Sequence, residues 1–186
     1  MDQITHPSAA AAPGAPVDTV ALTRLLVDID STTGKEGEVA GVLAAFLRER
    51  GYSVLEQPLD HGRTNVIAAV GEPELVFSTH FDCVPPFFPS RIEGGLLYGR
   101  GACDAKGILA AQVAAAERLR AAGETRIGLV FVAGEERGSD GAKAANRIGS
   151  KSQFLINGEP TDLRLGAATR GAFRVRLKST GKAAHS

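Results

Sequence analysis

The chain has 186 residues, of which 44% are hydrophobic, and its 21 basic and 21 acidic residues give a formal net charge of zero. This length allows one domain with a substantial core and leaves room only for an incomplete second one. A neutral chain lacks the basic surface of proteins that bind nucleic acid or anionic membranes, so we expect neither partner. Two cysteines, Cys83 and Cys103, form neither a disulfide framework nor a Cys-x-x-Cys metal motif, which favours a reducing, cytoplasmic location.

The first residues differ in composition from the rest. Residues 1–16 are rich in Ala and Pro, carry Asp2 in place of a basic start, and lack an apolar segment of signal-peptide length. We therefore expect a disordered tail over 1–16. Elsewhere no stretch approaches the roughly 20 consecutive apolar residues that a membrane-spanning helix needs.

Two amphipathic helices and three strands are predicted next. Residues 17–30 place apolar side chains at helical spacing behind Asp18 as N-cap, and residues 38–50 repeat the pattern with Gly51 in the C-cap region. The third strand is almost wholly apolar, which indicates a central place in its sheet. The three strands are expected at 52–57, 65–70 and 75–79, with His61 solvated in the turn between the first two.

Potential metal ligands appear where the third strand ends. Residues 78–82 read S-T-H-F-D, and side chains two apart on a strand project to the same face, so His80 and Asp82 can touch. A carboxylate behind an imidazole fixes the tautomer of a metal-binding histidine. Taken alone, however, such a pair is more often a hydrogen-bonded surface pair than a metal site.

A loop and a glycine-rich turn follow. The segment 83–96 contains three prolines and is expected to be an irregular loop beside the site, in which Phe87 and Phe88 fit equally well as a pocket wall or as anchors to the core. The sequence G-R-G-A-C-D-A-K-G at 99–107 then places Asp104 just before a helix predicted over 105–122. Its Lys-Gly order reverses that of a phosphate-binding Walker loop, which excludes that motif.

Two further apolar strands also end in acidic residues. Residues 127–133 lead to Glu135 and Glu136, and residues 153–156 lead to Glu159, with a short helix predicted between them at 139–148. Consecutive residues of an extended segment point in opposite directions, so one glutamate of the pair can bind a metal while the other faces elsewhere; an exposed acidic turn is the alternative. Helices alternating with strands that end in such residues predict an α/β sheet with a site beyond one edge.

Five motifs occur in order along the chain: T-H-F-D at 79–82, G-R-G-A-C-D-A-K-G at 99–107, G-E-E at 134–136, N-G-E-P-T at 157–161 and G-K-A-A-H-S at 181–186. Taken together they resemble those of the M20 metallopeptidases, which include acetylornithine deacetylase, succinyl-diaminopimelate desuccinylase and glutamate carboxypeptidase. The resemblance covers nearly everything from residue 18 to the end. The resemblance implies a three-layer α/β/α zinc-peptidase-like catalytic domain with a mixed, mainly parallel sheet over 17–165, and the start of an α+β lid and dimerisation domain over 166–186. Alternating apolar and polar residues at 173–178 indicate a strand there with one solvated face.

The resemblance also implies a ligand set for two Zn²⁺ ions, with Co²⁺ or Mn²⁺ as substitutes, and a role for each site residue. The Asp104 carboxylate would bridge the two ions. The Asp104–Ala105 peptide bond would be cis, which aims that carboxylate between them. Asp82 would orient the metal-binding histidine, and Glu135 would be the general base that takes a proton from the attacking water. In a homodimer, His185 would reach the site of the partner subunit and stabilise the oxyanion. The remaining ligands would be His80 and Glu159 for one ion and Glu136 for the other.

The implied activity is hydrolysis of the amide bond of an N-acyl amino acid, of the acetylornithine deacetylase or succinyl-diaminopimelate desuccinylase type. A dipeptidase or carboxypeptidase of the same family is the alternative, and a metal-binding remnant without hydrolytic activity is another. The chain stops before the family's remaining metal-binding histidine, most of the lid and the arginine that grips the substrate carboxylate. We therefore expect the N-terminal part of an enzyme, which is inactive alone. Cys83 and Cys103 are expected to be buried free thiols rather than metal ligands.

Overall fold

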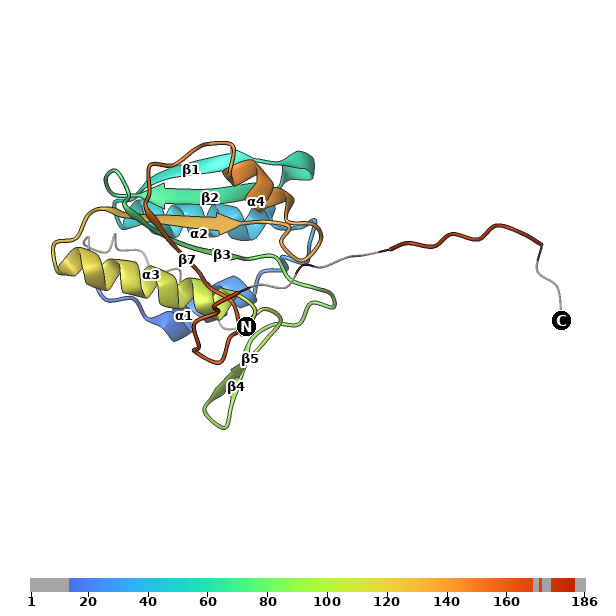
Figure 1. The fold of residues 1–186 in the computed structure, drawn as a ribbon. Coiled ribbons are helices and arrows are strands. Elements are labelled where there is room, and N and C mark those ends of the chain that lie inside the picture. The colour runs from blue at the N-terminus through green and yellow to red at the C-terminus, as the bar shows by residue number, and fades with distance from the viewer. Residues whose placement is uncertain (1–13, 169–170, 172–174, 183–186) are drawn as a thin grey trace.

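A five-stranded sheet forms the centre of the computed structural model, which describes residues 14–168, 171 and 175–182 (Figure 1). The strand order is β1-β2-β6-β3-β7; β2 is antiparallel to both of its neighbours, whereas β6, β3 and β7 are parallel to one another. This confirms the α/β class and the mixed, mainly parallel sheet. The strand predicted to be central, β3, lies inside the sheet between β6 and β7, but β6 is the middle strand. The strands are β1 Ser53–Pro58, β2 Thr64–Ala69, β3 Leu75–His80, β6 Ile127–Val132 and β7 Phe154–Asn157.

Three helices cover one face of this sheet. They are α1 Thr19–Val27, α2 Gly37–Glu49 and α3 Lys106–Ala121, and their apolar stripes enclose one continuous core with the inward side chains of β2, β3 and β6. The carboxylate of Asp18 accepts from the backbone N of Ala21 at 2.9 Å, which confirms the predicted N-cap of α1. The largest apolar side chains of the core include Leu26, Leu43, Leu47, Phe77, Phe81, Leu109, Ile127, Leu129 and Phe131.

A short helix, α4 Asp140–Ala145, lies against the opposite face. Gln57 Nε2 donates to the carbonyl of Ala144 at 2.9 Å, and Asn65 Nδ2 donates to the carbonyl of Gly141 at 2.8 Å. This helix, which was predicted over 139–148, is shorter than expected. Its last residues form tighter turns instead, in which the backbone N of residue 148 donates to the carbonyl three residues earlier.

A small hairpin corrects the prediction that residues 83–96 are irregular throughout. Strands β4 Arg91–Glu93 and β5 Leu96–Tyr98 pair antiparallel after the proline-rich part of the loop. All three prolines precede residue 90, so they do not block the pairing. Gly94 and Gly95 have φ values of 59° and 78°, which is the backbone of a two-residue hairpin turn that side chains other than glycine rarely adopt.

The ends of the described chain differ from one another. At the start, Gly14 N donates to Glu117 Oε2 at 3.1 Å and the Ala15 carbonyl accepts from Arg50 Nη1 at 3.0 Å; residues 1–13 of the expected tail lie outside the described residues. At the other end, the strand predicted over 173–178 is absent from described residues 175–178, where the chain has no neighbouring strand to pair with (Figure 1). Residues 173 and 174 are not described. Among the described helices, none is long and apolar enough to cross a membrane.

Candidate metal centre

The sheet topology explains why separate strand ends meet. Because β3, β6 and β7 are parallel neighbours, their carboxyl ends lie at one edge, and His80 at the end of β3 pairs in register with Val132 at the end of β6. The acidic turn, Gly134–Glu136, follows β6 directly, and Glu159 follows β7. Asp104 reaches the same edge from the glycine-rich turn that precedes α3.

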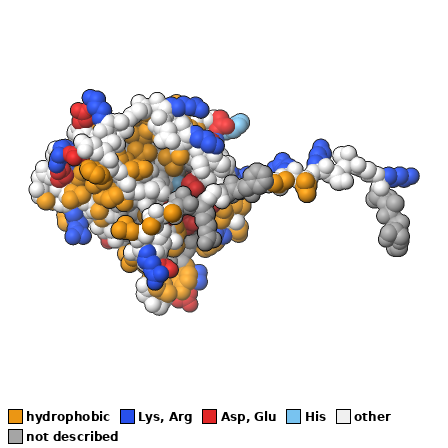
Figure 2. Space-filling model, viewed as in Figure 1, with side chains coloured by type: hydrophobic (Ala, Val, Ile, Leu, Met, Phe, Trp, Pro, Cys, Tyr) orange, Lys and Arg blue, Asp and Glu red, His pale blue; other side chains and the backbone are white. Residues whose placement is uncertain are grey.

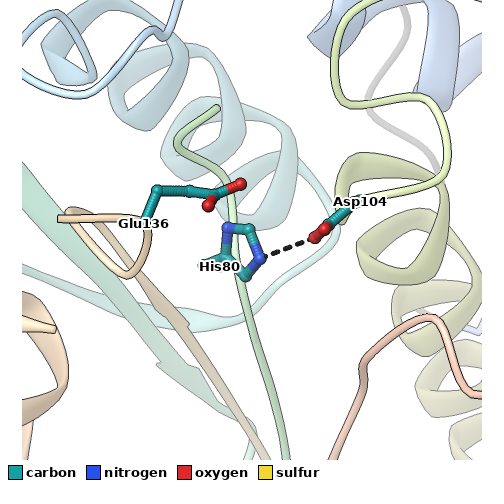
Figure 3. A group of neighbouring side chains, drawn as sticks. All are labelled: His80, Asp104 and Glu136. Carbon is teal, nitrogen blue, oxygen red and sulfur yellow. Dashed lines mark hydrogen bonds and ion pairs between the residues drawn. The ribbon is translucent and has the colours of Figure 1, made fainter. Parts of the chain in front are cut away.

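Three side chains from these segments form a compact group. His80, Asp104 and Glu136 each offer a ligand atom, and these atoms all lie within 4.8 Å of one another. Figure 3 shows the carboxylates of Glu136 and Asp104 next to the imidazole ring, with His80 Nε2 at 2.9 Å from Asp104 Oδ1. Glu159 Oε2 lies 3.8 Å from the same nitrogen. The His80 side chain is only 1% exposed, whereas that of Asp104 is 50% exposed, so the group opens to solvent on the carboxylate side.

Asp82 holds the imidazole from behind. Its backbone carbonyl lies 3.1 Å, and its carboxylate Oδ1 3.4 Å, from His80 Nδ1, so this nitrogen faces Asp82 and Nε2 faces Asp104. The Asp82 carboxylate is fully buried and accepts three further hydrogen bonds, from Thr33 Oγ1 at 2.9 Å and from the backbone N of Glu135 and of Glu136 at 2.9 and 3.2 Å. Asp82 thereby couples the orientation of the ring to the position of the acidic turn.

The charges of this group favour a bound cation. Burial disfavours the charged form of His80, but the Asp82 carboxylate, aided by Glu159 and Asp104, outweighs it and raises the pKa of His80 to about 9. Burial and the nearby charge of Asp104 raise the pKa of Glu136 above its usual value, and burial does the same for Glu159, although His80 opposes both shifts. Crowded carboxylates that raise one another's pKa are relieved by a metal ion, and imidazole with carboxylate oxygens is a donor set that suits zinc. The residues present therefore fit the metal that the sequence analysis implied.

A cavity of about 180 Å³ lies beside the group, and Cys103 lines it together with Asp104 and Glu136. The expectation of two buried thiols is confirmed for Cys83 and wrong for Cys103, which is exposed. Cys83 continues from the buried end of β3, whereas Cys103 lies at the surface part of the turn that carries Asp104. The proline-rich loop forms part of the same rim through Val84.

Phe87 and Phe88 do not pack in the core. Their side chains are 37% and 39% exposed, and the Phe88 ring lies 4.9 Å from the guanidinium carbon of Arg100. The Arg100 Nε donates to the Pro86 carbonyl at 3.0 Å. These contacts fasten the loop to the glycine-rich turn, so the alternative in which both rings anchor the loop to the core does not hold.

The sequence reasoning missed two residues that support the site. Thr33 has no pattern around it that signals a contact with Asp82, 49 residues away. The sequence around Lys106 indicates only that it is not the lysine of a Walker loop, yet its buried Nζ donates to the Leu26 and Ile29 carbonyls at 2.7 and 3.0 Å. It thereby fastens the start of α3 to the end of α1 next to Asp104.

Two expectations about the backbone and the lid have different outcomes. The Asp104–Ala105 peptide bond is cis, as the resemblance implied. His185, the residue expected to act in a partner subunit, lies outside the described residues. The ligand and catalytic roles of the other site residues remain predictions that the geometry supports.

Comparisons with known proteins agree with this arrangement. A family model described as peptidase family M20/M25/M40 matches residues 76–183. A probable carboxypeptidase of Aspergillus clavatus is 38% identical over 182 residues, covering 88% of this chain and 44% of that protein. The chain thus spans less than half the length of this curated relative.

Solved structures share the fold. A tripeptidase from Staphylococcus aureus matches 77% of this chain and 44% of its own, with a TM-score of 0.65 and 24% sequence identity. The Bacillus subtilis YXEP protein, described as a dinuclear metal-binding peptidase of the M20 family, matches 75% of this chain and 41% of its own, with a TM-score of 0.54 and 15% identity. At these identities the likeness concerns the fold of the catalytic domain.

Proposed function

Because the chain belongs to peptidase family M20/M25/M40, we propose that it supplies most of the metal centre of an enzyme that hydrolyses amide or peptide bonds. The observation that carries this proposal is the convergence of His80, Asp104 and Glu136, from three separate segments, to within 4.8 Å at the edge of the sheet. A solvent-open cavity of about 180 Å³ adjoins them. Ligands held by a rigid sheet beside an open pocket are what a hydrolytic metal site requires.

The proposed ligand set has two parts. His80, Asp104 and Glu159 would hold one ion, and Asp104 with Glu136 would hold a second. Two ions are also favoured by the dinuclear description of the Bacillus subtilis relative. Zinc is the metal that we propose, because imidazole and carboxylate donors suit it, with Co²⁺ or Mn²⁺ as substitutes. When bound, such ions lower the pKa of water and polarise the scissile carbonyl.

The protein residues supply the proton transfer and the positioning. Glu135 is proposed to accept the proton of the attacking water and to return it to the leaving amine, which is the work of a general base followed by a general acid. Its place is fixed by its own backbone N, which donates to Asp82 Oδ1 at 2.9 Å. Asp82 also keeps His80 in the orientation that presents Nε2 to the site. In a homodimer, His185 of the partner subunit is proposed to stabilise the oxyanion.

Two substrate classes remain as candidates. The resemblance favours an N-acyl amino acid first and a peptide with a free carboxyl end second. The name of the Aspergillus clavatus relative, a probable carboxypeptidase, favours the second. Both substrates present an amide carbonyl next to a carboxylate-bearing residue, so the same metal chemistry serves either.

A substrate panel tests the proposal. The full-length gene product is assayed on N-acetylornithine, N-succinyl-diaminopimelate and dipeptides with free carboxyl ends, before and after metal removal with a chelator. We expect turnover of at least one substrate, its loss on chelation and its return with Zn²⁺. Hydrolysis that survives complete metal removal would contradict the proposal, and so would a metal-loaded protein that turns over none of the panel.

A further inference from the structure

The Asp82 carboxylate is the point at which two loops meet. Thr33 reaches it from the loop between α1 and α2, and the backbone N atoms of Glu135 and Glu136 reach it from the acidic turn. The first loop is held beside Asp82 by backbone hydrogen bonds, from Thr33 N to the Cys83 carbonyl and from Cys83 N to the Ser31 carbonyl, both at 3.0 Å. The acidic turn comes from the end of β6 instead, so its distance from this loop depends on a contact between the two.

Arg63 lies directly behind the acidic turn. Its side chain is 9% exposed and forms a two-pronged ion pair with Asp140, with Nη1 at 3.3 Å from Oδ1. Gly134, with φ of 72°, rests on this pair so closely that a Cβ at that position would lie 2.7 Å from Arg63 Nη1 and 2.1 Å from Asp140 Oδ1. The first residue of the acidic turn therefore has its place defined by the Arg63–Asp140 pair.

The other end of the link is Glu36, next to the loop that carries Thr33. Its side chain is fully buried; Oε2 accepts from the Gly34 backbone N at 2.6 Å, and Oε1 lies 3.7 Å from Arg63 Nη1 without a hydrogen-bond partner. A buried carboxylate of this kind is costly unless an opposite charge faces it, and Arg63 supplies that charge. Arg63 thus spans from the α1–α2 loop to the acidic turn.

We propose that Arg63 is a positioning residue for the metal centre: the Glu36–Arg63–Asp140 link sets the spacing at which Thr33 and the acidic turn both close on Asp82. Its importance for catalysis rests on the proposed function, in which Glu135 is the base and Glu136 a ligand. The contacts themselves require neither metal nor substrate. They are therefore testable in the 186-residue chain.

Hydrogen exchange of the backbone amides is the first test, because the amides of Glu135 and Glu136 report directly on their bonds to Asp82. In Arg63→Met, we expect these two amides to exchange about tenfold faster or more, relative to core amides of β6 such as Leu129. Asp140→Asn keeps the shape of the side chain and should show the same selective change. If Arg63→Met does not fold, Asp140→Asn carries the comparison.

Two controls separate positioning from general stability. Arg50→Met removes an arginine that is equally buried, with a side chain 9% exposed, and that follows the end of α2, where it pairs with Glu117 of α3. In this variant the amides of the acidic turn and of the core should change together. Asp60→Asn removes another partner of Arg63 that lies on an exposed turn, and it should leave the acidic turn unaffected. The proposal is overturned if Arg63→Met accelerates the two turn amides no more than the core amides, or if Arg50→Met shows the same selectivity.

Zinc affinity and the absorption spectrum of the Co²⁺-loaded chain give a second reading. Arg63→Met should weaken zinc binding by about 10–100-fold, the usual effect of removing support behind metal ligands, and should alter the cobalt spectrum, with partial recovery in Arg63→Lys. Arg50→Met should change neither. If the amides respond as expected but the parent chain binds no metal, the positioning contact stands and the proposed function fails.

Discussion

Glu135 and Glu136 are adjacent in the sequence but have different surroundings. The Glu136 carboxylate belongs to the compact group with His80 and Asp104, and burial together with the Asp104 charge raises its pKa. Glu135 is fixed through its backbone, and among the described residues its side chain is not part of that group. This difference agrees with the roles proposed for them, proton transfer for Glu135 and metal binding for Glu136.

Substitution of each glutamate separates these roles. In the full-length protein, Glu135→Ala should lower turnover by about 10²–10⁴-fold and keep most of the metal, because only the proton acceptor is lost. Glu136→Ala should lose metal, since it removes a ligand. Metal analysis of both purified variants decides between the assignments. A Glu135→Ala protein without metal beside a metal-replete Glu136→Ala protein means that the roles are reversed.

Cys103 is the residue whose environment departed most from expectation, and it makes a second prediction. Its side chain is exposed in the cavity beside Asp104, whereas burial raises the pKa of the Cys83 thiol. A thiol-alkylating reagent should therefore modify Cys103 well before Cys83 in the folded chain, which mass spectrometry of the digested protein measures. Cys103→Ser should retain zinc. A Cys103→Ser chain that has lost its zinc would show that this thiol is a ligand after all.

At the scale of elements, the long periodic segments were predictable. The three large helices and five sheet strands lie within three residues of their predicted bounds, because apolar side chains every 3.6 residues mark a helix and short, largely apolar runs mark buried strands. The hairpin at 91–98 was missed because the preceding prolines dominated the interpretation, although Gly94–Gly95 signalled a turn. The strand at 173–178 depends on a pairing partner, which its own sequence does not reveal.

Some residues of the site could be predicted from the sequence, and others could not. His80, Asp104, Glu136 and Glu159 were identifiable because each follows a recognisable strand or turn. Residues that act behind the site, such as Arg63, had no motif, since they depend on contacts between segments far apart in the sequence. Arg63 and Asp140, for example, are 77 residues apart.

The ion pair behind the acidic turn also gives α4 a pH-dependent contribution to stability. Arg63 holds the pKa of Asp140 below its usual 3.8, so ionised Asp140 stabilises the fold above that pH, and the contribution is lost as the pH falls through the lowered value. Asp140→Asn should lower the unfolding free energy at pH 7 by at most about 1 kcal/mol, because its side chain is 44% exposed and solvent screens the pair. Thermal melts at pH 7 and at pH 3 measure this. A difference between variant and parent that grows on acidification would contradict the assignment.

At the scale of the whole molecule, the sheet leaves apolar surface exposed. The β7 edge exposes Phe154, Leu155 and Ile156 by 59%, 65% and 49%, and Figure 2 shows patches of hydrophobic side chains on the visible face. A monomer rarely leaves an apolar strand at an unpaired sheet edge. We therefore expect the isolated chain to self-associate, or to bind a segment that adds to β7.

The incomplete ligand set of the second ion leads to a prediction about activity. The second proposed ion has only Asp104 and Glu136 from the described part of the chain, and a catalytic zinc generally needs three protein ligands. The purified 186-residue chain should therefore show no deacylase or peptidase turnover, and the full-length gene product should. Rates are measured on the same substrate panel for both proteins. Full activity of the chain alone would refute this prediction.

Zinc titration of the metal-free chain tests the central claim most directly, because the proposed function depends on a metal centre at the edge of the sheet. We predict that the chain binds zinc, that His80→Ala and Asp104→Ala each abolish tight binding, and that His61→Ala, which removes a histidine whose side chain is 85% exposed, has no effect. Circular dichroism confirms that each variant is folded. A chain that binds no zinc, or a folded His80→Ala variant that binds it as the parent does, would contradict the account.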